Sequence, residues 1–126
     1  MLLQISGERL LRDVQKDFNR AYPFLKIEFF KNDDVRKAHY PVQKQLSPSL
    51  KITDARYKNV YDGEFEVTDN MSVSDLENKF MDLFGLSIQV FRRSGNLWLE
   101  TSMTDNWSLK QQNENGEEIS VAKPRL

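Results

Sequence analysis

The feature that most constrains the fold of this chain is a helix–strand unit that occurs twice. The first unit is a predicted amphipathic helix over residues 8–22 followed by an alternating strand at 25–29; the second is a helix over 73–84 followed by a strand at 86–90. In each helix apolar residues recur at steps of three and four, so they lie on one face. We expect the two units to share one core, because neither alone buries enough apolar surface.

The two units also align with each other. Their helices match at an offset of 62 positions, which pairs Phe18 with Phe80, and their strands match after a one-residue gap, at an offset of 61. A further strand is predicted ahead of each helix, over residues 1–5 and 63–68. This pattern allows an internal β-α-β-β duplication; the alternative is that any two amphipathic helix–strand units look alike.

Residues at the helix ends fit the assignment. Ser6 is the predicted N-cap of the first helix, and Pro23 ends it. Ser72 and Asp75 have the spacing of a capping box ahead of the second helix, with aspartate in the place of the usual glutamate. Gly85 follows that helix, where a residue in the left-handed conformation is needed.

The second strand continues into a predicted hairpin that returns over residues 97–101. A turn centred on Ser94-Gly95 pairs Val90 with Leu99 and Phe91 with Trp98. We expect the shifted register, with Phe91 opposite Glu100 and Arg93 opposite Trp98, to mix the two faces, so it is disfavoured. The favoured register divides the hairpin into one face with Ile88, Val90, Leu97 and Leu99 and another with Gln89, Phe91, Trp98 and Glu100.

The remaining segments are expected to be less regular. A short helix is predicted from Thr104 to Asn115, capped by Thr104 or Asp105 and followed by Gly116. Residues 117–126 are predicted to be a short strand or a loose tail, and residues 32–62 to be loops with one or two short strands. The sequence therefore predicts an α+β two-layer sandwich, with helices 8–22 and 73–84 on one mainly antiparallel sheet, and a single domain over residues 1–116.

Composition supports one packed domain and limits its chemistry. The chain has 126 residues, of which 39% are hydrophobic and 29% charged, a balance typical of a globular domain with one core. It contains no cysteine, so neither a disulfide nor a thiolate zinc site can form. We find neither a leader pattern nor an apolar run long enough to span a membrane, and we expect a cytoplasmic protein that does not bind membranes.

The outer face of the hairpin is the main candidate for a binding site. Phe91 and Trp98 are expected to lie opposite each other, and the residues expected to flank them are Arg93, Gln89, Glu100 and, if the repeat holds, Phe30. Aromatic rings with a nearby arginine are typical of protein-recognition patches, and the same set could stack nucleic-acid bases. The alternative is that helix 8–22, or the C-terminal helix through Trp107, covers this face as ordinary core.

Charge is uneven along the chain. Residues 31–58 hold seven Lys or Arg against three Asp, and residues 59–91 hold one Lys against seven Asp or Glu. Phosphate contacts could come from the basic segment, through Arg36, Lys37, His39, Lys44, Lys51, Arg56 and Lys58. The net charge of −1 argues against nucleic-acid binding, and we expect the two segments to attract each other weakly across the surface.

Catalytic motifs are missing from the sequence. There is no P-loop, dinucleotide glycine fingerprint, HExxH or GxSxG pattern, and His39 is the only histidine. We expect no metal and no cofactor. The alternative of a small enzyme or ligand-binding protein needs a polar cleft near residues 32–62, with Asp33, His39 or Tyr40 converging in it.

The stretches 92–101, 104–109 and 112–116 resemble small uncharacterised proteins of Bacteroidetes-type bacteria. The resemblance covers a minor part of the chain, implies no function and transfers no residue roles. We therefore expect a non-enzymatic interaction or regulatory module, which binds a protein partner or a second copy through the aromatic sheet face.

Overall fold

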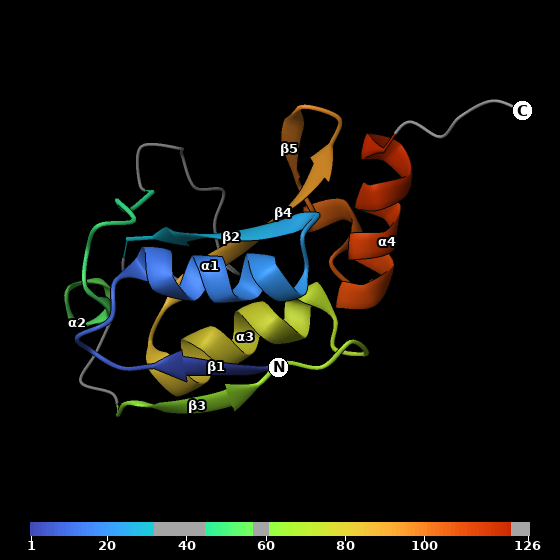
Figure 1. Ribbon diagram of the computed structural model, residues 1–126. Helices are drawn as coiled ribbons and strands as arrows, with labels where there is room; N and C mark the ends of the chain where they lie inside the picture. Colours follow the sequence, from blue (N-terminus) through green and yellow to red (C-terminus); the bar gives the residue numbers. More distant parts are fainter. Residues whose placement is uncertain (32–44, 57–60, 122–126) are drawn as a thin grey trace, which may run out of the picture.

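The computed structural model describes residues 1–31, 45–56 and 61–121, which form an α+β sandwich (Figure 1). Its elements in chain order are β1 (Leu2–Ile5), α1 (Leu11–Ala21), β2 (Leu25–Phe30), α2 (Ile52–Ala55), β3 (Gly63–Glu66), α3 (Val73–Phe84), β4 (Ser87–Ser94), β5 (Leu97–Glu100), the 3₁₀ turn η2 (Ser102–Thr104) and α4 (Leu109–Ser120). The predicted fold class is confirmed. The predicted regions 32–44, 57–60 and 122–126 lie outside the described residues.

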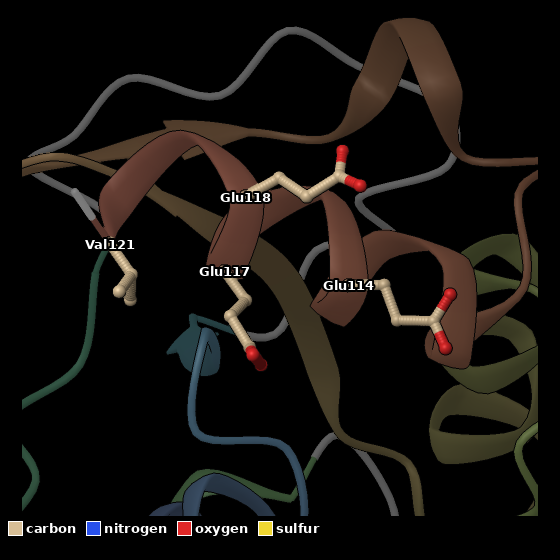
Figure 2. Close-up of a pocket in the computed structure, with 4 residues that line it drawn as sticks. All are labelled: Glu114, Glu117, Glu118 and Val121. Atoms are coloured by element: carbon tan, nitrogen blue, oxygen red, sulfur yellow. The ribbon is translucent and has the colours of Figure 1, made fainter. Parts of the chain in front are cut away.

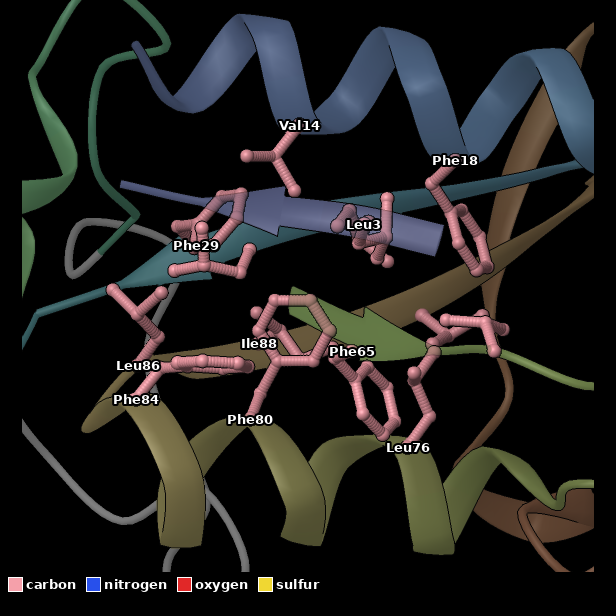
Figure 3. Close-up of a cluster of buried hydrophobic side chains, with 14 of the residues drawn as sticks. Leu3, Val14, Phe18, Phe29, Phe65, Leu76, Phe80, Phe84, Leu86 and Ile88 are labelled. Carbon is pink, nitrogen blue, oxygen red and sulfur yellow. The ribbon is translucent and has the colours of Figure 1, made fainter. Parts of the chain in front are cut away.

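The strands form two antiparallel sheets, where the sequence predicted one. β1 pairs with β3, and the second sheet has the order β2-β4-β5. Helices α1 and α3 face each other across the core, and strands of both sheets run between them (Figure 3). The prediction of a single sheet was wrong because α1 carries the chain from one sheet to the other, so that β1 and β2 are not neighbours.

One continuous apolar cluster fills the space between these elements. Its centre is aromatic: the Phe80 ring lies 6.3 Å from Phe29, 6.1 Å from Phe65 and 6.1 Å from Phe84, measured between centroids, and each pair meets edge to face. Such pairs add roughly 0.5–1.5 kcal/mol each beyond the burial of their surface. Phe18 and Val14 close the cluster from the α1 side (Figure 3).

The strand pairing follows the predicted repeat. Leu3 lies opposite Phe65 in the first sheet, and Glu28 lies opposite Gln89 in the second. The two offsets are 62 and 61 positions, which are those of the sequence alignment. In each sheet, one residue therefore lies opposite its own counterpart in the repeat. This is the arrangement expected when two halves are related by an approximate two-fold axis. Common ancestry of the two halves stays a prediction.

Local signals at the ends of α3 are confirmed. Ser72 Oγ accepts a 3.0 Å hydrogen bond from the Asp75 N–H, and Gly85 has a left-handed φ of 62°. The prediction for the start of α1 was wrong, because Leu10 and not Ser6 occupies the N-cap position. There the Asp13 carboxylate accepts the Leu10 N–H at 3.0 Å.

Tertiary contacts explain the late start of α1. The first two N–H groups of the helix donate to the carbonyls of Leu50 and Pro48, at 2.9 and 3.0 Å. The Ile52 N–H donates in turn to the Arg9 carbonyl at 2.8 Å. A chain segment distant in sequence therefore replaces the side-chain cap that helix starts commonly use.

The predicted hairpin register was also wrong. Phe91 lies opposite Glu100, and Arg93 lies opposite Trp98, because the two-residue loop is Gly95-Asn96. This loop needs a positive φ at its first position, and Gly95 supplies it with φ 63°. The predicted division into faces is still correct. Moving the two-residue loop by one position shifts each cross-strand partner by two residues, and a shift of two keeps every side chain on the same face of the sheet.

The C-terminal helix starts later and runs further than predicted. It spans Leu109–Ser120, and Ser108 caps it by accepting the Gln111 N–H at 3.1 Å. Gly116 does not end the helix but lies buried within it: a Cβ there would be 2.9 Å from Phe24 Cβ. Close packing against the start of β2 therefore explains this glycine, and residues 117–120 are helix instead of strand or tail.

Candidate functional site

The β4–β5 hairpin projects past the sandwich, with α4 beside it (Figure 1). β5 is an edge strand of its sheet, so one side of it pairs with no other strand among the described residues. At the tip of the hairpin the Gly95 N–H donates a 3.0 Å hydrogen bond to Ser120 Oγ at the end of α4. The hairpin and α4 are thus one structural unit.

A buried polar network holds α4 against β4. Arg92 Nη1 donates to Gln112 Oε1 at 2.6 Å, and the guanidinium lies 5.5 Å from the centre of the Trp107 ring. Gln112 is fully buried and donates in turn to the Thr104 carbonyl at 2.7 Å. The sequence analysis missed this network. A signal for it was present, because Arg92 lies two residues after Val90 and therefore on the same, inner side of β4.

The outer side of the hairpin carries the predicted aromatic pair, which we call the aromatic face, defined by Lys26, Phe91 and Trp98. The two rings share a side of the sheet but lie diagonally. Lys26 Nζ connects them, at 5.5 Å from the Phe91 centroid and 5.1 Å from the Trp98 ring, and pairs with Glu28 at 3.2 Å. Because a cation already occupies the aromatic surfaces, a stacking platform for bases is not favoured.

The other predicted members of this face differ in accessibility. Arg93 and Glu100 are exposed, and Arg93 Nε donates to the Gly95 carbonyl at 2.9 Å. Gln89 and Phe30 point to the same side but are buried, with 4% and 6% exposure. Both lie further from the hairpin tip than Phe91 and Trp98, in a part of the sheet that is covered. They are therefore not part of an accessible patch with those two rings.

The inner side of β5 presents a different surface. Leu97 and Leu99 are 66% and 43% exposed, and Ile119 on α4 is 53% exposed. Asn113 and Ile119 lie three positions before and after Gly116, which packs against the sheet, so they occupy opposite flanks of α4. Asn113 accepts the Phe24 N–H on the β2 side, and the sheet order β2-β4-β5 then places the Ile119 flank on the β5 side. We call Leu97, Leu99 and Ile119 the apolar edge. Sequence reasoning placed both leucines on the side of Val90 but could not show that the core ends before them.

Of the predicted basic site, only Lys51 and Arg56 lie within the described residues. Lys51 pairs with Glu8 at 3.1 Å and Arg56 pairs with Asp62 at 2.9 Å. The other members, Arg36, Lys37, His39, Lys44 and Lys58, lie outside the described residues, as do Asp33 and Tyr40 of the predicted cleft.

One carboxyl group has an unusual environment. Glu77 of α3 accepts the Val90 N–H at 3.2 Å, and Thr101 Oγ1 donates to the Val90 carbonyl at 2.9 Å. These two side chains thus bond the backbone N–H and C=O of Val90 on the edge of β4, beyond the end of β5. Burial raises the pKa of Glu77 to about 7; the Val90 N–H lowers it, and the charge of Asp105 raises it further.

A hollow on α4 is lined by Glu114, Glu117, Glu118 and Val121 (Figure 2). The three carboxylates point in different directions and do not converge on one point. Within the described ranges no three histidine or carboxylate side chains come together as metal ligands would. The hollow therefore does not form a metal site within the described residues.

No helix in the described part of the chain has the length and apolar character needed to cross a bilayer. Comparison with known proteins returned no matching family model, no matching curated protein and no matching solved structure.

Proposed function

We propose that this protein is an interaction module that binds a protein partner through the β4–β5 hairpin. The observation that carries the proposal is the exposure of apolar side chains around β5. Of the eight large hydrophobic side chains that are exposed in the described residues, Leu97 and Leu99 lie on β5 and Ile119 lies on the flank of α4 on the same side. Exposed apolar groups concentrated at one place are typical of protein-binding surfaces.

The surroundings of the apolar edge support the same function. An edge strand offers unpaired backbone groups to another chain, which side chains then select. The aromatic face lies on the other side of the same sheet, and its exposed flanking residues, Arg93 and Glu100, carry opposite charges. A half-buried tryptophan with a charged rim is a common composition for the centre of an interface.

The test is a quantitative pull-down from a native extract with three proteins. They are the wild type, Leu97→Ser/Leu99→Ser, and the control Leu83→Ser, which changes a leucine of similar exposure (47%) on α3. Circular dichroism first establishes that each is folded. We expect a protein, which can be another copy of this chain, to be captured by wild type and control and lost in the double variant. Equal capture by all three proteins, or capture by none, would contradict the proposal.

A further inference from the structure

We propose that the partner of the hairpin is a second copy of this chain, bound by antiparallel pairing of β5 with β5 around Trp98. The inference deepens the proposed function and rests on it. Its starting point is the free side of β5. In a two-residue turn the Leu97 N–H points inward to Ser94, so the alternation of the ladder turns the N–H and C=O of Trp98 and Glu100 outward.

The sequence of β5 is complementary to itself. Leu97-Trp98-Leu99 reads the same in both directions, so antiparallel pairing about Trp98 sets Leu97 against the partner's Leu99 and Trp98 against the partner's Trp98. Apolar residues then face apolar residues on both sides of the sheet. An unrelated extended peptide could occupy the same edge, but nothing would require its sequence to mirror that of β5.

Charge selects the same register. Pairing about Trp98 sets Glu100 opposite the partner's Asn96, without a like-charged neighbour. Pairing about Leu99 would set Glu100 against the partner's Trp98, and pairing about Glu100 would set two carboxylates directly opposite each other, which is destabilising. The net charge of −1 on each chain adds little long-range repulsion.

The joined sheet also has room for the apolar edge. In the pair, β4 and the partner's β4 would be three strand spacings apart, roughly 14 Å. The α4 helix of each copy lies over its own β4 and is about 10 Å wide. The leucines of both β5 strands and Ile119 from both helices fill the trough between the helices. A four-residue strand buries less than the roughly 800 Å² per partner of stable complexes, so we expect a reversible dimer at micromolar concentrations.

The first test uses the unmodified chain. Sedimentation velocity over a range of concentrations is expected to show a monomer–dimer equilibrium, which Leu97→Ser/Leu99→Ser shifts to monomer and Leu83→Ser leaves unchanged. A wild type that stays monomeric at all concentrations would overturn the second-copy proposal. If the pull-down then still captures a different protein that the double variant loses, the proposed function stands and only the identity of the partner is wrong.

The second test reads the register. Because the chain has no cysteine, Leu97→Cys and Leu99→Cys each carry a single thiol. In the proposed pairing the thiol of the Leu97→Cys variant faces the thiol of the Leu99→Cys variant. The Cα separation of the two positions is then about 4.5 Å, suitable for a disulfide, whereas like positions are too far apart. We expect oxidation of the mixture to cross-link the two variants much faster than either variant alone. Faster cross-linking of one variant with itself would overturn the register, and equal slow rates would overturn the pairing.

Discussion

Glu77 is a carboxyl group whose properties follow from its place at the interrupted edge of β4. The unfolded chain releases the proton of this group near pH 4.5, and the folded chain near pH 7. Between these values the folded state holds a proton that the unfolded state does not. The free energy of unfolding therefore falls by about 3 kcal/mol as the pH rises through this range. Above pH 7 the loss is complete, and the titration of this group causes no further change.

The substitution Glu77→Gln tests this effect, because glutamine keeps an acceptor for the Val90 N–H without the charge. We expect the variant to be more stable than the wild type by up to about 3 kcal/mol at pH 8, and the difference to vanish near pH 4. Urea denaturation at several pH values measures it. Glu64→Gln, at an exposed carboxylate, is the control and should show little change. A difference for Glu77→Gln that does not vary with pH would contradict the assignment.

At the scale of single elements, the sequence was informative where a signal acts within its own helix. Ser72, Gly85 and Pro23 all mark helix ends close to where the structure has them. The errors arose where a distant segment decides. Ser6 does not cap α1, because backbone carbonyls from residues 48 and 50 take that role. The exposure of Leu97 and Leu99 depends on where the core ends and α4 begins, which strand periodicity does not report.

Gly116 is the sharpest case of this kind, and it yields a prediction for α4. Alanine at a helix interior position normally adds about 1 kcal/mol of stability over glycine. Here the added Cβ would lie 2.9 Å from Phe24 Cβ and 3.1 Å from Arg92 Cγ. We expect Gly116→Ala to destabilise the protein by about 1–3 kcal/mol, because overpacking outweighs helix propensity.

Urea unfolding followed by tryptophan fluorescence measures this change, since Trp107 lies against Arg92 beside α4. The control is Glu118→Ala, at an exposed position of the same helix, for which the change should be within about 0.5 kcal/mol. If Gly116→Ala were more stable than the wild type, α4 would not be packed as closely on the start of β2 as the structure has it.

At the scale of the whole molecule, the two β-α-β halves cannot be independent, because each sheet takes strands from both. β1 of the first half pairs with β3 of the second, and β2 pairs with β4. The shared cluster of phenylalanines joins the halves further, with Phe29 from one and Phe80 from the other in edge-to-face contact. This arrangement predicts that damage to one half is felt equally in the other.

Phe18→Ala tests that coupling from the side of α1. Phe18 is fully buried, so its loss should cost about 3–5 kcal/mol. The two tryptophans, at positions 98 and 107, both lie in the second half of the chain and report on the hairpin and α4. In a cooperative molecule, their fluorescence and the far-ultraviolet circular dichroism shift to the same lower midpoint in urea. Lys16→Ala, exposed on the same helix, should shift neither. A fluorescence midpoint that stays in place while the circular dichroism midpoint falls would mean that the hairpin and α4 fold as a separate unit, which the shared sheets do not allow.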